Sequence, residues 1–101
     1  MKQKKLKNVI ARSRDAGVCA GYLKSQSKDG KQVVLVESRR LWYWKGAASL
    51  HQLANEGVKH PNECKFPAVL LGDHQMTEVC EVLSVSKVGQ ASIAAVPVWK
   101  A

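Results

Sequence analysis

Short runs of apolar residues, broken by turn residues, dominate the first forty positions of the chain. Two such runs occupy residues 7–13 and 18–26, and the segment 15–17 between them ends in a glycine, as a tight hairpin loop requires. An Asp-Gly turn at 29–30 precedes residues 31–38, whose centre is four consecutive aliphatic residues. This pattern predicts three antiparallel strands in a meander, with the third strand buried on both faces.

Gly21 lies in the middle of the second predicted strand. A missing side chain at such a position marks a bulge, a sharp bend, or the close approach of another backbone or a ligand. We expect a bend, and therefore a curved sheet.

The first predicted helix follows Ser49, a residue type that caps helix N-termini. Leu50, Leu53 and Ala54 then repeat with the i, i+3, i+4 spacing of an apolar helix face, and Gly57 supplies a stop signal. A helix of two turns fits this segment.

Two further strands are predicted at 68–71 and 76–85, separated by a turn at 72–75. In the longer one, the odd positions carry Thr77, Val79, Leu83 and Val85, interrupted only by Glu81, and this alternation predicts one inward face in a curved sheet. Cys80, within this segment, is predicted to be a small buried hydrophobe, as is Cys19 in the second strand.

A second helix is predicted to begin at Ser86, to run through Ala95 and to end before Pro97. Its apolar side is predicted to consist of Val88, Ala91 and Ala95.

Together these elements predict an α+β fold with a small antiparallel, strongly curved sheet or partial barrel of about five strands and one or two short helices. A chain of 101 residues that is 46% hydrophobic supports one compact core. We expect a single domain over residues 7–101, preceded by a basic, flexible extension at 1–6. Its apolar runs are too short to span a bilayer and no export segment is visible, so a cytoplasmic protein without membrane contact is expected.

Positive charge is concentrated at the start of the chain. Residues 1–31 contain nine Lys or Arg and two Asp, and so account for +7 of the net charge of +8. Such an excess favours a negatively charged partner, either nucleic acid or an anionic small molecule. Apart from the terminal lysines, the candidate nucleic-acid contacts are Arg12, Arg14, Lys24 and Lys28.

Cysteine and histidine spacing gives little support to a metal site. The chain has three cysteines and no C-x-x-C pair. His60 and Cys64 have a helical spacing, with His51 or His74 as outside ligands, but Pro61 breaks the local helix and no fourth ligand is evident. We therefore predict neither a disulfide framework nor a bound metal.

Catalytic motifs are also missing from the sequence. It contains no nucleophile elbow, no Walker loop and no H-E-x-x-H pattern. Glu78 and Glu81 lie close together, but an exposed strand edge explains them as well as acid and base roles would. We therefore expect a binding protein with no catalytic residues and no cofactor.

The most distinctive stretch is 39–46, which holds three of the six aromatic residues and three positive charges. In an extended strand its side chains alternate between two faces that are each part aromatic and part cationic. Guanidinium groups bind phosphates and aromatic rings stack on bases, although the same residues also suit an ordinary small core. We expect one tryptophan to fill the core and Arg39 or Arg40 to meet an anion. The predicted ligand-binding residues are Arg39, Arg40, Trp42, Trp44 and Lys45.

The core Arg-x-x-Trp-x-Trp-x-Gly-Ala at 39–47, together with Asp-Ala-Gly-Val at 15–18 and Ser-Leu at 49–50, resembles a small family of phage and prophage proteins of unknown function. The resemblance extends from about Val9 to Val85. It implies a small phage accessory protein in the cytoplasm of a bacterial host and, by association with such genomes, a role against host defence.

Three hypotheses follow, in order of preference. The first is a non-enzymatic reader or sponge for an anionic ligand such as a nucleotide signal of host immunity, with homo-oligomerisation completing the pockets. The second is a nucleic-acid-binding protein that uses Arg12, Arg14, Lys24 and Lys28 as well. The third is a host-takeover protein, similar in action to a CRISPR inhibitor, that blocks a host defence protein through an exposed patch.

Overall fold

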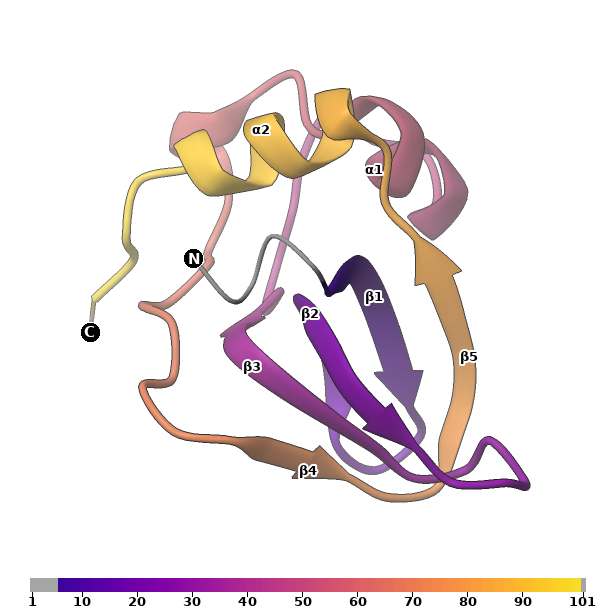
Figure 1. The fold of residues 1–101 in the computed structure, drawn as a ribbon. Helices are drawn as coiled ribbons and strands as arrows, with labels where there is room; N and C mark the ends of the chain where they lie inside the picture. The colour runs from indigo at the N-terminus through magenta and orange to yellow at the C-terminus, as the bar shows by residue number, and fades with distance from the viewer. Residues whose placement is uncertain (1–5, 101) are drawn as a thin grey trace.

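A five-stranded antiparallel sheet in the order β4-β3-β2-β1-β5 curls into a half-barrel, with two helices packed together at one end (Figure 1). The computed structural model describes residues 6–100, so all but Leu6 of the expected basic extension lies outside the described residues. The α+β class and the curved five-stranded sheet are confirmed. The elements are β1 (Lys7–Ser13), β2 (Gly17–Gln26), β3 (Val33–Arg40), α1 (Leu50–Glu56), the 3₁₀ turn η2 (Pro61–Glu63), β4 (His74–Met76), β5 (Val79–Ser84) and α2 (Lys87–Ala95).

The predicted meander is confirmed, because β1 pairs with β2 and β2 pairs with β3, both antiparallel. The third strand lies two residues later than predicted. It is buried on only one face in full, where Val33 and Leu35 lie, while Val34 and Val36 are half-buried. The last strand, β5, returns to pair with β1, and this pairing completes the curl.

Gly21 lies opposite a bulge in β3. The register of β2 and β3 shifts at this point, so both Glu37 and Ser38 face Gly21. Glu37 has a φ of 52°, and a Cβ at Gly21 would lie 3.0 Å from the carbonyl oxygen of Val36 and 3.2 Å from the Cα of Ser38. Glycine is therefore needed here because another backbone approaches closely.

The bulge sets which side chains of β3 enter which core. One core, here called the inner core, lies inside the curl and takes residues from all five strands. The other, the helix-side core, lies between the sheet and the helices. One extra residue reverses the alternation, so Arg39 and Arg40 leave β3 on the helix side and the inner side respectively. Inner-core members are Val9, Ala11, Cys19, Val33, Leu35, Met76 and Val79, and the largest helix-side members are Ile10, Leu41, Leu53, Phe66 and Ile93.

Both predicted helices are confirmed with their caps. The Ser49 hydroxyl accepts a hydrogen bond from the backbone N–H of Gln52 at 3.2 Å, and that of Ser86 accepts one from Gly89 at 2.9 Å. The predicted apolar side of α2 is wrong, because Val88 is exposed while Gly89 and Ile93 are buried. The reason is that α2 packs against α1 through its glycine.

The predicted strand at 68–71 is also wrong. These residues are irregular and Leu71 is 98% exposed, although the N–H of Leu70 donates to the carbonyl of Ser38 in β3 at 2.7 Å. The edge of β3 instead pairs with His74–Met76, part of which had been predicted as a turn.

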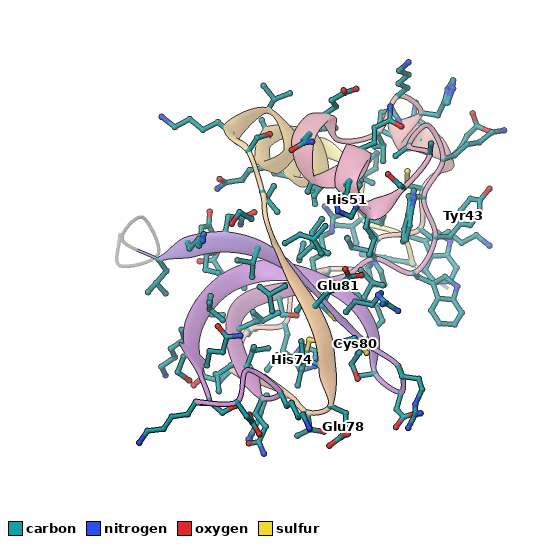
Figure 2. The ribbon with its side chains drawn as sticks, turned by 90° about the vertical axis from the view of Figure 1, so that its right-hand side faces the viewer. Tyr43, His51, His74, Glu78, Cys80 and Glu81 are labelled. Atoms are coloured by element: carbon teal, nitrogen blue, oxygen red, sulfur yellow. The ribbon has the colours of Figure 1, made fainter. Side chains whose placement is uncertain are left out.

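A bulge between β1 and β5 explains two further differences. Arg12 faces Glu81 while Ser13 faces Val79, which leaves Cys80 without a partner. Cys80 is consequently exposed on β5 (Figure 2), although Cys19 is buried as predicted. The same bulge divides the predicted inward face of this segment, since Val79 joins the inner core while the later apolar residues Leu83 and Val85 pack on the helix side.

No helix within residues 6–100 is long and apolar enough to cross a membrane.

Candidate functional site

Arg39, predicted to bind a ligand, is instead a buried structural residue. It is 6% exposed, and its guanidinium lies 5.5 Å from the centre of the Phe66 ring. Four hydrogen bonds of 2.7 to 3.0 Å connect it to backbone carbonyls of Phe66, Pro67, Ile93 and Val96. Burial lowers the pKa of Arg39, and the four carbonyls compensate for the loss of water around its charge. These contacts connect the chain after η2 to the end of α2.

Arg40, the next residue, lies half-buried on the opposite face. One terminal nitrogen, Nη1, donates to the carbonyl of Ala16 in the loop between β1 and β2. Arg40 thereby joins this loop to the aromatic segment that follows β3. The two segments enclose an open pocket of about 410 Å³, here called the tryptophan pocket, lined by residues 14–18 and by Arg40, Leu41, Trp42 and Trp44.

The aromatic segment is fixed by its backbone, while one of its rings remains exposed. The N–H of Leu41 donates to Val18 at 2.9 Å and that of Trp42 to Lys65 at 3.1 Å. Trp44 is half-buried and packs against the helix-side core, whereas Trp42 is 66% exposed. Trp44 is therefore the tryptophan that packs on the core, as expected of one of the two, and the ring of Trp42 is left exposed beside the pocket.

Arg14 brings a second guanidinium to the tryptophan pocket from the hairpin loop. Its side chain is highly exposed, and the only acidic residue among the described residues that line the pocket is its neighbour Asp15. The Arg14 Nε and the Asp15 Oδ1 are 3.7 Å apart, and an exposed pair of this length holds its partners weakly. Two guanidinium groups against one carboxylate leave the pocket with a net positive charge.

The remaining candidate cations do not line this pocket. Arg12 forms an ion pair with Glu81 at 2.6 Å, and this contact raises the pKa of Arg12. Lys24 pairs with Asp73 at 2.7 Å, and Lys28 lies exposed in the turn after β2. Only Arg14 of the predicted nucleic-acid set therefore joins the aromatic cluster.

Lys45, the last predicted ligand contact, lies outside the pocket lining as well. Its Nζ is 3.0 Å from an oxygen of Glu63, and this hydrogen bond raises the pKa of Lys45 and lowers that of Glu63. The positive charge of Lys45 is therefore paired with the carboxylate of Glu63 at the surface.

The residues considered for a metal site serve other contacts. The sulfur of buried Cys64 accepts the backbone N–H of Lys45 at 3.4 Å, and the exposed His60 lies 3.8 Å from Glu63. In the part of the chain that the structure describes, no three His, Cys, Asp or Glu side chains gather closely enough to hold a metal ion.

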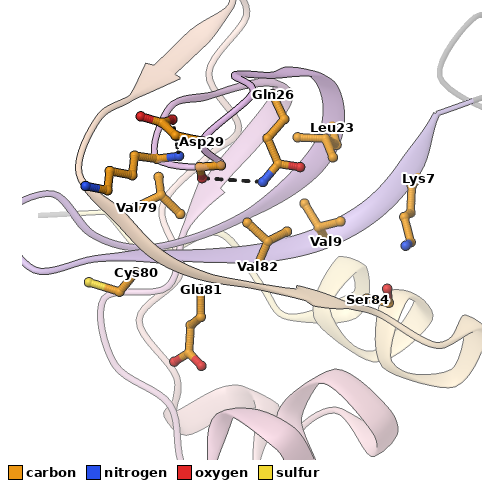
Figure 3. Close-up of a pocket in the computed structure, with 12 residues that line it drawn as sticks. Lys7, Val9, Leu23, Gln26, Asp29, Val79, Cys80, Glu81, Val82 and Ser84 are labelled. Carbon is orange, nitrogen blue, oxygen red and sulfur yellow. Dashed lines mark hydrogen bonds between the residues drawn. The ribbon is translucent and has the colours of Figure 1, made fainter.

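Another cavity, of about 520 Å³, is lined by β1, β5, the end of β2 and the turn that follows it (Figure 3). Val9, Leu23 and Val82 form its apolar floor, with Gln26 and Asp29 at its edge. Gln26 and Asp29 are engaged within their own turn: Gln26 donates to Gly30, and Asp29 accepts from Ser27 and Lys31. Glu81, also in the lining, forms an ion pair with Arg12. The other polar side chains of the lining are those of Lys7, Lys31 and Ser84, and no aromatic ring lies among the described lining residues.

Sequence reasoning missed a polar cluster on the inner face. The Ser38 hydroxyl lies 2.8 Å from Nδ1 of His74, and both line a pocket with Cys19 and Arg40. His74 (Figure 2) had been placed in a turn, and its pairing opposite β3 could not be read from local pattern. The available signal for Ser38 was its place two residues after the aliphatic run 33–36, within the predicted third strand.

Comparison with known proteins gives a family and little more. No curated protein matches the chain, and no solved structure does. The model of the family described as "Domain of unknown function (DUF6948)" matches residues 6–93, and the chain therefore belongs to this family.

Proposed function

We propose that this protein binds an anionic ligand with a flat ring, of the nucleotide class, in the tryptophan pocket, without catalysing a reaction on it. The observation that carries the proposal is the convergence of Arg14 and Arg40, from two separate segments, beside the exposed ring of Trp42. Guanidinium groups form paired hydrogen bonds with phosphate oxygens, and an indole face stacks on a base.

The expected affinity is weak. Stacking of one base on an aromatic side chain contributes about 1–3 kcal/mol. A hydrogen bond to a charged group contributes about 1.5–3 kcal/mol. Stacking and two such hydrogen bonds together contribute about 4–9 kcal/mol, and association costs about 4 kcal/mol or more, so we expect dissociation constants on the order of 0.1 to 1 mM at best.

The biological setting of the proposal is a phage accessory protein in the cytoplasm of a bacterial host, where it binds a nucleotide signal of host defence. Support for this setting comes from the resemblance of the Arg-x-x-Trp-x-Trp-x-Gly-Ala core to phage and prophage proteins. Homo-oligomerisation belongs to the same proposal, since the pocket is open and a second copy would cover it. Mass spectrometry of the natively purified protein would report both the subunit number and any nucleotide that purifies with it.

The binding test compares two pocket variants with a matched control. Calorimetric titration would use mononucleotides, cyclic dinucleotides and a short single-stranded oligonucleotide as probes. We expect Trp42→Ala and Arg14→Ala each to weaken binding of a mononucleotide or cyclic dinucleotide about tenfold, the equivalent of 1.4 kcal/mol. Lys28→Ala removes an equally exposed charge outside the pocket and should leave binding unchanged.

Two results would overturn the proposal. One is that no probe binds, or that binding survives both pocket substitutions. The other is that only the oligonucleotide binds, with an affinity that falls steeply with salt, because a multi-phosphate interface releases many counterions. That second result would support the nucleic-acid hypothesis in its place.

A further inference from the structure

Arg40 also lines a second pocket, of about 330 Å³, here called the serine–histidine pocket. The bulge at Glu37 turns Ser38 towards the inner side, where its hydroxyl lies 2.8 Å from Nδ1 of His74 on the neighbouring strand. Ser38 is 3% exposed, and it is therefore a buried hydroxyl held in one place by an imidazole. Cys19 and the segment 67–70 form the rest of the lining.

The charges around this pocket are unbalanced. None of its described lining residues is acidic. Two carboxylates are adjacent to lining residues along the chain. Glu37, next to Ser38, is exposed and lines a different pocket, and Asp73, next to His74, lies 2.7 Å from Lys24 in an ion pair. Burial, followed by the positive charge of Arg40, lowers the pKa of His74. Burial raises the pKa of Cys19 despite the opposing effect of Arg40, so the thiol supplies no negative charge either.

Arg40 retains donors that could bind a ligand here. Among residues 6–100, only the carbonyl of Ala16 accepts a hydrogen bond from its guanidinium, which carries five N–H groups. The Ser38 hydroxyl can rotate to donate, and a protonated His74 would donate through both ring nitrogens. Three donor groups then converge on one cavity that contains a single fixed positive charge.

We propose that Ser38, Arg40 and His74 form a binding site for a tetrahedral oxyanion, of the sulfate and phosphate class, and that His74 takes up a proton when the anion binds. In the free protein Arg40 repels a second positive charge at His74. A bound anion reverses that effect, because an opposite charge within a few ångströms favours the protonated imidazole. The site uses neither tryptophan, so it goes beyond the nucleotide proposal and does not depend on it.

The test measures the titration of all three histidines by NMR in sodium sulfate and in sodium chloride of equal ionic strength. Sulfate is the probe because its own charge is constant from pH 5 to pH 8, which phosphate's is not. We expect a higher pKa for His74 in sulfate and unchanged titrations of His51 and His60, which are exposed and outside the pocket. Sulfate affinity should fall as pH rises between the free and bound His74 pKa values, by up to tenfold per pH unit for one coupled proton.

Equal His74 titrations in the two salts would overturn the proposal, and so would a shift shared by all three histidines. Wild-type protein suffices for this measurement, so it does not rely on a variant that folds. Arg40→Gln removes the charge and shortens the side chain while keeping a polar amide, and it should abolish the sulfate effect. A sulfate effect that persists in Arg40→Gln would also contradict the site.

Trp42→Ala separates this inference from the nucleotide proposal. It should retain the sulfate effect on His74 while its nucleotide binding weakens about tenfold. If no nucleotide binds the wild type but sulfate still shifts His74, only the function proposed for the tryptophan pocket fails.

Discussion

Two adjacent arginines, Arg39 and Arg40, lie on opposite faces of the sheet and differ in how many of their donors the fold satisfies. On the helix side, Arg39 donates four hydrogen bonds to carbonyls and is 6% exposed. On the inner side, Arg40 donates one, to Ala16, and lines two pockets. The same side chain is structural where the fold satisfies its donors and available to a ligand where it does not. The helix-side face therefore holds the molecule together, and the inner side and its rim carry the candidate chemistry.

The largest expected effect comes from substituting Arg39. Arg39→Met removes the donors to four carbonyls and should lower the free energy of unfolding by about 3–5 kcal/mol, as for other broken buried charge networks. Arg40→Met removes a single hydrogen bond and should cost less, about 1–3 kcal/mol. Urea unfolding of both variants measures the difference. A larger loss for Arg40→Met would break the contrast between the two faces.

Alanine substitutions at two glycines compare the tight contact between α1 and α2 with the open loop before β4. A Cβ on Gly89 would lie 2.3 Å from the carbonyl oxygen of Ala54, and this backbone atom of α1 cannot move aside cheaply. Gly89→Ala should therefore destabilise the protein by about 2–3 kcal/mol through overpacking. Gly72→Ala is the matched control, since a Cβ there meets nothing within 4 Å, and its effect should stay within about 0.5 kcal/mol. Similar unfolding midpoints for the two variants would contradict this contrast.

A smaller effect is expected from pH on the inner side. The folded-state pKa of His74 is lowered from 6.5, so the unfolded chain binds a proton more readily. Stability contributed by neutral His74 is complete above pH 6.5 and decreases as the pH falls towards the folded pKa, by at most about 1.4 kcal/mol per pH unit. Urea unfolding between pH 7.5 and 5.5 measures this slope. His74→Gln should flatten it, and an equal slope in the variant would assign the effect to other groups.

Much of the fold follows from local pattern. The two turns that end in glycine and the caps at Ser49 and Ser86 are short-range signals that fix where elements begin and end. Such signals act within a few residues, and a sequence shows them directly.

The candidate site is predictable only in part, because it depends on contacts between distant residues. The aromatic and cationic composition of 39–46 indicated the tryptophan pocket, but alternation alone could not assign Arg39 and Arg40 to their faces. A single bulge at Glu37 decides the register there, and an insertion of one residue reverses every face after it. The pairing of Arg12 with Glu81 likewise depends on β5 returning beside β1.

The smallest effect on stability is expected from substituting Trp42. This variant tests whether the exposed ring serves a ligand or supports the fold. The ring is 66% exposed and the segment is fixed by backbone hydrogen bonds, which an alanine keeps. Trp42→Ala should therefore change the free energy of unfolding by no more than about 0.5 kcal/mol. Trp44→Ala should cost more, because Trp44 packs on the helix-side core. If Trp42→Ala unfolds as easily as Trp44→Ala, the ring at position 42 supports the fold. Weaker ligand binding by the Trp42→Ala variant would then no longer identify a binding site.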